Sequence, residues 1–145
     1  MIFCSSALEL ESNNNIKMNN LIVDAARDKI FLAFIVNKNI YTCSHENSKI
    51  NFEKLMILIN EFLKNNKSSL DNIGAIYINR GPGSFAGIRN SLSTVKALHL
   101  TKKIEYYCFS FADFKDSAAI EYTEVPQLCE KYKIKKNLIN PIYLS

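Results

Sequence analysis

The stretch Ala75–Leu100, AIYINRGPGSFAGIRNSLSTVKALHL, decides how this chain folds. It begins with β-branched and aromatic residues at Ile76–Ile78, which are typical of a buried strand. A glycine-proline-glycine turn follows at Gly81–Gly83, and apolar residues then recur at helical spacing. The stretch therefore predicts a strand, a tight loop and a helix in direct succession.

Three short apolar segments precede this unit. They are Leu21–Val23, Ile30–Val36 and Ile40–Cys43, and polar residues separate them. Asn and Asp in the separating segments favour turns, because they tolerate backbone conformations that most residues avoid. The pattern predicts an antiparallel meander of three strands.

The period of the apolar residues changes from that of a strand to that of a helix after Asn51. The Asn51 side chain can cap a helix, and apolar residues recur on one helical face between Phe52 and Leu63. Ile57 points away from that face. This helix is therefore expected to bury two sides, one against the sheet and one against another helix.

The segment after the central stretch continues the alternation of strands and helices. A fifth strand is predicted at Ile104–Phe109. Ser110 and Asp113 have the spacing of a capping box, which predicts a third helix. The pattern weakens after Lys115, where a short helix around Pro126–Lys133 and a last strand at Ile139–Leu144 are predicted.

The predicted order is three strands, a helix, a strand, a helix, a strand and a helix. This α/β order is that of the ribonuclease H/actin-like (ASKHA) fold, with a mixed five-stranded sheet whose first, fourth and fifth strands are parallel. Residues 18–114 are expected to form this first domain. Residues 1–17 are expected to be a flexible extension, and residues 115–145 the remnant of a truncated second domain.

Composition narrows the class of protein. The 145 residues are 48% hydrophobic with a net charge of +4, which is ordinary for one globular domain. The four cysteines show neither a metal-binding spacing nor a disulfide pattern, so reduced thiols and no metal are expected. No apolar run approaches the length of a membrane span. The sequence predicts a cytoplasmic protein that does not enter the membrane.

Two kinds of active site known on this fold can be sought in the sequence. A two-metal nuclease needs acids at adjacent strand ends, but Asp24 ends the first strand whereas Asn79 and Arg80 end the fourth. An actin-like ATPase needs a glycine-containing phosphate loop after the first strand, and Ala25-Ala26 stand there. No catalytic residue is therefore predicted. An ATP-dependent enzyme or a small-molecule-binding protein of this fold stays as the alternative.

The glycine-rich loop allows two interpretations. The amides at the start of the following helix, with Arg80 and Arg89, could bind an anion. In the favoured interpretation the loop is a tight corner, with glycines in unusual conformations and Ser84 as a helix cap. The residues of this signature loop are Arg80, Gly81, Pro82, Gly83, Ser84, Phe85, Gly87 and Arg89.

The same loop closely resembles the RGPGSFTGLR signature of the TsaB (YeaZ) family. The similarity runs from Leu21 to about Phe114, and the ending Pro141–Leu144 is similar to the family's Pro-x-Tyr-Leu-Arg. Two features depart from the family. Asp24 is followed by Ala25-Ala26 instead of Thr-Ser, and most of the second domain is missing, which implies a reduced TsaB.

The resemblance implies a function in assembly. TsaB is a noncatalytic scaffold that dimerises with the catalytic subunit TsaD, which transfers threonylcarbamoyl to the adenosine beside the tRNA anticodon. Helices of both partners form a four-helix bundle, and the ATPase TsaE joins this complex. TsaB meets tRNA indirectly, through the complex. No cofactor is expected on this chain, ATP/ADP and metal are expected on the partner subunits, and a homodimer of the isolated chain is left open. The predicted interface residues are Phe52, Met56, Ile57, Ile59, Leu63, Ile88, Ser91, Leu92 and Val95.

Overall fold

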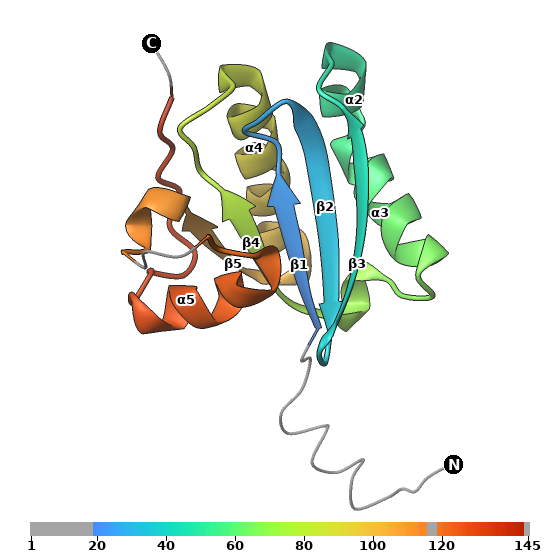
Figure 1. Cartoon of the computed structure of the whole chain (residues 1–145). Helices are drawn as coiled ribbons and strands as arrows, with labels where there is room; N and C mark the ends of the chain where they lie inside the picture. Colours follow the sequence, from blue (N-terminus) through green and yellow to red (C-terminus); the bar gives the residue numbers. More distant parts are fainter. Residues whose placement is uncertain (1–18, 116–118, 144–145) are drawn as a thin grey trace, which may run out of the picture.

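A mixed five-stranded sheet forms the centre of the molecule. The computed structural model describes residues 19–115 and 119–143, and the predicted extension 1–17 lies outside them (Figure 1). The strand order is β3-β2-β1-β4-β5. β1 runs antiparallel to β2 and parallel to β4, and β4 runs parallel to β5, which confirms the predicted sheet. The strands are β1 (Asn19–Asp24), β2 (Lys29–Val36), β3 (Asn39–Glu46), β4 (Ile73–Asn79) and β5 (Glu105–Phe109).

The helix predicted to begin after Asn51 begins earlier and is divided in two. Ser48, not Asn51, is the cap, because its extended backbone lets its hydroxyl oxygen accept a bond from the Asn51 amide. The first helix ends at Glu53 with Lys54 as its cap, and the second begins at Leu55. The helices are α2 (Lys49–Glu53), α3 (Leu55–Asn65), α4 (Phe85–Lys102) and α5 (Val125–Lys131).

The predicted third helix after Ser110 is only a 3-10 turn, Phe111–Asp113. The capping box itself is present, since the Asp113 carboxylate accepts the Ser110 amide at 2.8 Å. The helix does not continue because Phe114 has an extended backbone and buries its ring in the core. The capping box thus predicted where the turn begins but not its length.

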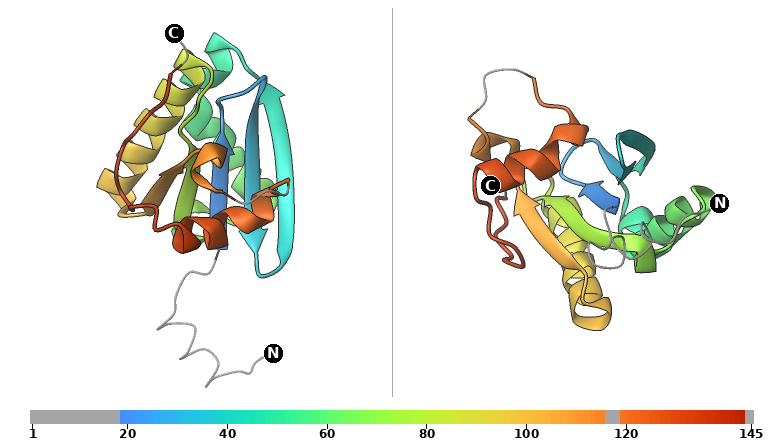
Figure 2. Two further views of the ribbon diagram at one scale, coloured as in Figure 1. Left: turned by 60° about the vertical axis from the view of Figure 1, so that its left-hand side comes forward. Right: turned by 90° about the horizontal axis from the view of Figure 1, so that it is seen from below.

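Helices cover both faces of the sheet (Figure 2). α2, α3 and α4 bury one face in a large apolar core, and α5 covers part of the other. The α5 side chains Val125 and Leu128 pack in one cluster with Ile22 and Phe109 of the sheet. Residues 119–143 therefore complete the core of this domain, and their origin as a second-domain remnant stays a prediction.

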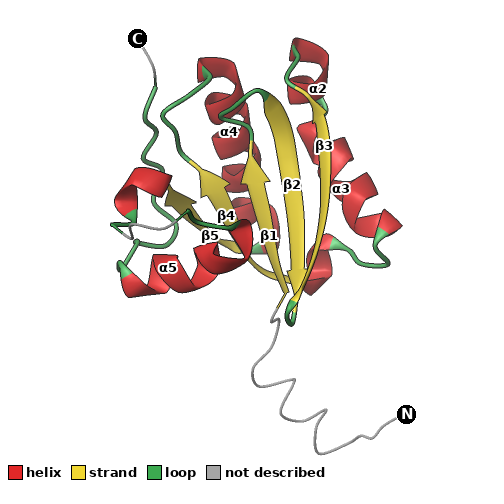
Figure 3. Ribbon diagram, in the orientation of Figure 1, coloured by secondary structure: helices red, strands yellow, loops and turns green. Residues whose placement is uncertain are grey.

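The predicted last strand runs to Leu144, which lies outside the described residues; as far as Tyr143 the structure has a single β-bridge there, between Tyr143 and Gly83. The chain reaches it as a strap, defined here as residues 136–143, along the outer edge of β5 (Figure 3). The Asn137 amide donates to the Tyr106 carbonyl, and the Asn137 side-chain oxygen accepts from the Tyr106 amide. These bonds cover the edge of β5 without a full strand. No helix in the described part of the chain is both long and apolar enough to cross a membrane.

Candidate functional site

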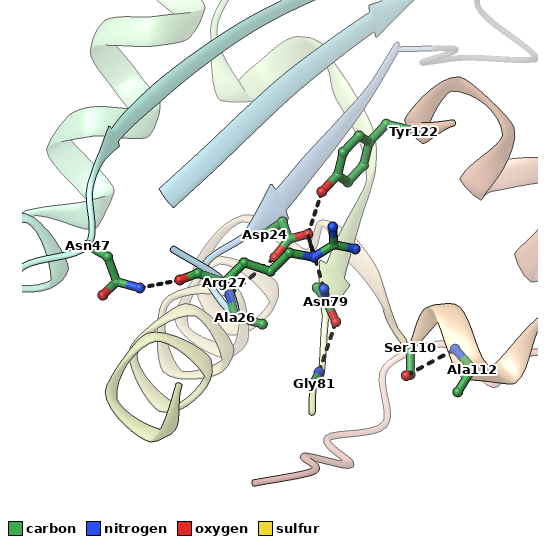
Figure 4. A network of polar contacts seen from close by, with 9 residues as sticks. All are labelled: Asp24, Ala26, Arg27, Asn47, Asn79, Gly81, Ser110, Ala112 and Tyr122. Carbon is green, nitrogen blue, oxygen red and sulfur yellow. Dashed lines mark hydrogen bonds and ion pairs between the residues drawn. The ribbon is translucent and has the colours of Figure 1, made fainter. Parts of the chain in front are cut away.

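Asp24 lies at the carboxyl end of β1, and its carboxylate is engaged by groups of its own chain (Figure 4). It accepts the Asn79 side-chain amide at 3.0 Å and the Tyr122 hydroxyl at 2.6 Å. It also accepts the Ala26 amide at 3.1 Å, and the Arg27 guanidinium lies 3.7 Å away. The side chain is 1% exposed.

This network connects three distant parts of the chain. Asn79 ends β4, and Tyr122 belongs to the turn before α5, 98 residues after Asp24. Burial, and then the hydrogen bond to Asp24, raise the pKa of the Tyr122 hydroxyl, so it stays a donor. Within residues 19–115 and 119–143, no three His, Cys, Asp or Glu side chains come together as metal ligands do. The contacts of Asp24 are those of a structural junction.

Replacing Asp24 with alanine is expected to lower the free energy of unfolding by roughly 3 kcal/mol, because the buried amide of Asn79 and the hydroxyl of Tyr122 lose their acceptor. Tyr122→Phe is expected to cost about 1 kcal/mol, since two other donors to Asp24 remain. Urea denaturation measures both variants. Equal losses in the two variants would contradict the central position of Asp24.

The signature loop is packed backbone against backbone onto the segment after β1. Gly81 has φ +114°, a conformation that residues with a Cβ rarely adopt, and its amide donates to the Asn79 side chain at 2.9 Å. A Cβ at Gly83 would lie 2.1 Å from the Ala26 carbonyl oxygen. A Cβ at Gly87 would lie 1.8 Å from the Ala25 carbonyl oxygen. The glycines are thus required by close approach within the chain.

The charged and polar side chains of the loop also have partners within the chain. Arg80 forms two bonds to the Asp113 carboxylate, at 2.7 and 3.2 Å, and a third to the Asn140 carbonyl in the strap. The Ser84 hydroxyl oxygen accepts the Gly87 amide and caps α4. Arg89 lies over the Phe85 ring, on the surface. This geometry favours the tight corner over the anion site, because Arg80 is directed at Asp113 and the strap.

Most residues of the predicted interface are buried by their own domain. Their helices are amphipathic, and the faces named from the sequence are those that cover the sheet. These side chains are covered by their own domain in the folded chain. Their contact with a partner stays an untested prediction. The buried ones are Phe52, Ile59, Leu63, Ile88, Ser91, Leu92 and Val95; Met56 is half-buried.

Unlike these residues, Ile57 is exposed. Its exposure agrees with the predicted direction of its side chain, away from the buried face of the helix. Ile57 is 54% exposed on α3, and Ile50 on α2 is 68% exposed. Leu100, near the end of α4, is 69% exposed. Exposed apolar side chains mark a protein-binding surface where they form one contiguous patch. Periodicity would have found Ile50 and Leu100, because both lie opposite the buried faces of their helices.

The strand order, the β-meander and the helices on the sheet define a ribonuclease H/actin-like domain. The solved structure of YeaZ from Pseudomonas aeruginosa shares this fold, with a TM-score of 0.58 and 20% identity over 63% of this chain and 43% of its own. A family model described as TsaD, tRNA N6-adenosine threonylcarbamoyltransferase, matches residues 45–113.

Two curated relatives agree with these matches. Both are tRNA threonylcarbamoyladenosine biosynthesis proteins TsaB, from two Buchnera aphidicola strains. The protein of Buchnera aphidicola subsp. Schizaphis graminum is 31% identical over 90 residues, and that of subsp. Baizongia pistaciae is 35% identical over 83. The matches cover 62% and 50% of this chain, and 43% and 38% of the relatives. Over part of its length the chain is therefore similar in sequence to TsaB proteins and in fold to YeaZ. The chain spans about two fifths of the length of these relatives.

Proposed function

We propose that this chain is a noncatalytic scaffold subunit for tRNA threonylcarbamoyladenosine formation. It docks on a TsaD-type catalytic subunit, which transfers the threonylcarbamoyl group to the adenosine beside the anticodon. The TsaB-named relatives support the pathway, and the TsaD-type family model supports a relation between this chain and the catalytic subunit. ATP, ADP and metal belong to the partner subunits, a TsaE-like ATPase among them, and tRNA meets the assembly through TsaD.

The exposed apolar side chains of α2 and α3 carry this proposal. Ile50 and Ile57 leave more than half of their surface to water. A partner that covered both would gain about 1.5–3 kcal/mol for each fully buried side chain. Aliphatic side chains of this kind form the centre of helix-on-helix interfaces, where water is excluded.

The internal contacts of the two candidate chemical sites support the noncatalytic part of the proposal. The Asp24 carboxylate is saturated by donors of its own chain, and Arg80 is held by Asp113. Binding a substrate at either place would require these buried or partly buried bonds to break first. Each such bond costs about 1–3 kcal/mol when a buried group is left unpaired.

Reconstitution tests the proposal. Purified TsaD and TsaE, with an enzyme that supplies threonylcarbamoyl-adenylate and unmodified tRNA, are expected to form modified adenosine only when this chain is added. Mass spectrometry of digested tRNA measures the product. Unchanged product formation without the chain would contradict the scaffold function. Turnover of ATP by the isolated chain, measured by calorimetry, would favour the enzymatic alternative instead.

A further inference from the structure

The two edges of the sheet are treated differently. The β5 edge is covered by the strap, through the bonds of Asn137 to Tyr106 and a bridge between Lys136 and Tyr107. The outer edge of β3 has no pairing strand among the described residues. Figure 3 shows β3 as the outermost strand on that side. An uncovered edge offers a row of backbone donors and acceptors to another strand.

β3 also lacks the features that prevent edge pairing. The run Asn39–His45 contains no proline, lysine, arginine or acid, and the pairing of β2 with β3 is continuous over eight residues without a bulge. Ile40 and Tyr41 are 36% and 44% exposed. A long, regular edge whose charges lie only at its two ends, with exposed apolar side chains between them, is a template for strand addition.

The hairpin geometry decides which groups of β3 point outward. β2 and β3 are joined by the two-residue turn Asn37-Lys38, so Val36 and Asn39 flank the turn as a hydrogen-bonded pair. Residues whose backbone groups point away from β2 then alternate along β3 with residues whose backbone groups point toward β2. Ile40, Thr42, Ser44 and Glu46 direct their backbone groups away from β2.

We propose that the occupant of this edge is a second copy of the chain, with β3 pairing antiparallel to β3 about a two-fold axis at Thr42. This arrangement joins two five-stranded sheets into one. The outward-directed residues then meet one another, as an antiparallel ladder requires. The resulting pairs are Thr42 with Thr42, Ile40 with Ser44, Tyr41 with Cys43, Asn39 with His45, and Lys38 with Glu46.

Charge complementarity selects both the partner and the register. Lys38 lies in the turn just before β3 and Glu46 is the last residue of β3, so the two-fold axis brings each beside its opposite charge in the other copy. A shift by two residues would place Lys38 against Ser44 or Glu46 against Ile40. The strand is therefore complementary to itself in one register. The pairing leaves Ile50, Ile57 and α4 outside the β3 ladder and goes beyond the proposed function.

Analytical ultracentrifugation of the full chain tests the pairing. We expect a reversible dimer with a Kd of roughly 1–100 µM. Thr42→Pro removes an outward amide that β2 does not use, and is expected to weaken the dimer at least about tenfold while the monomer stays folded by circular dichroism. Thr42→Ala keeps the amide and is the matched control, with dimerisation retained. A chain that stays monomeric to about 0.5 mM overturns the proposal, whether the edge is then free or covered by residues 1–18.

Cross-linking tests the register. Tyr41→Cys, in a chain with Cys4→Ser, places its thiol opposite Cys43 of the other copy in a non-hydrogen-bonded pair, about 4.5 Å between Cα atoms. Mild oxidation is expected to yield a disulfide-linked dimer on a non-reducing gel, and adding Cys43→Ser is expected to abolish it. Lys38→Glu is expected to weaken the dimer, and Glu46→Lys in the same chain to restore it. A dimer that shows neither the cross-link nor the rescue uses another surface and overturns the proposal.

Discussion

Replacing Ile57 with glutamate is expected to abolish capture of this chain by a TsaD-type subunit. Ile57 is 54% exposed on α3, so the charge is hydrated in the monomer and the fold is retained. In the proposed complex the carboxylate would be buried without a partner, which costs several kcal/mol and at least a hundredfold in Kd. A pull-down with tagged TsaD measures the loss.

A control variant distinguishes this surface from a general effect of an added charge. Leu138 is an apolar residue of the strap with 48% exposure, at the β5 edge. Leu138→Glu is expected to bind TsaD like the unmodified chain. Unchanged capture of Ile57→Glu, with the fold confirmed by circular dichroism, would remove α3 from the proposed interface.

Replacing Gly87 with alanine is expected to destabilise the fold by about 3 kcal/mol or more, the upper end of the cost of overpacking. Helix propensity alone predicts the opposite sign, because alanine is favoured over glycine in a helix by about 1 kcal/mol. The steric effect is larger, since the new Cβ would lie 1.8 Å from the Ala25 carbonyl oxygen, and this neighbour is backbone. Either α4 or the segment after β1 has to move.

The neighbouring residue provides the matched control. Ala86 lies in the same turn of α4 but is exposed. Ala86→Gly is expected to cost only about 1 kcal/mol, the propensity difference. Urea denaturation measures both variants. A higher urea midpoint for Gly87→Ala than for the unmodified chain would mean that the close approach of α4 to Ala25 does not constrain the fold.

Much of the fold could be predicted because its elements have strong local signals. The β-branched run before Gly81 is β4, and the apolar period after Ser84 is α4. Boundaries were less reliable. The helix start depends on which side chain meets the free amides, and Ser48 does so while Asn51 bonds to the Glu46 carbonyl. Both are good capping residues, and only the path of the chain after β3 selects between them.

The candidate site was less predictable, because it depends on contacts between residues far apart in the sequence. The residues around Tyr122 do not indicate that its hydroxyl reaches Asp24. Likewise, the residues around Arg80 do not indicate that it bonds to Asp113. The sequence also left open what covers the apolar face of each helix. Periodicity finds an apolar face on α4 but does not say whether the sheet or a partner covers it, and the sheet covers Leu92 and Val95.

The sequence alone determined the order of the elements from β1 to β5, the tight loop and the family signature, since each depends on the chemistry of adjacent residues. The tertiary structure decided what covers each surface: Asp24 is saturated, Ile57 is exposed, and the β3 edge is unpaired within the described residues. Burial and the pairing of polar groups are properties of segments brought together by folding. For this reason a local pattern predicts an element, whereas only the packed chain shows which of its faces are free to bind.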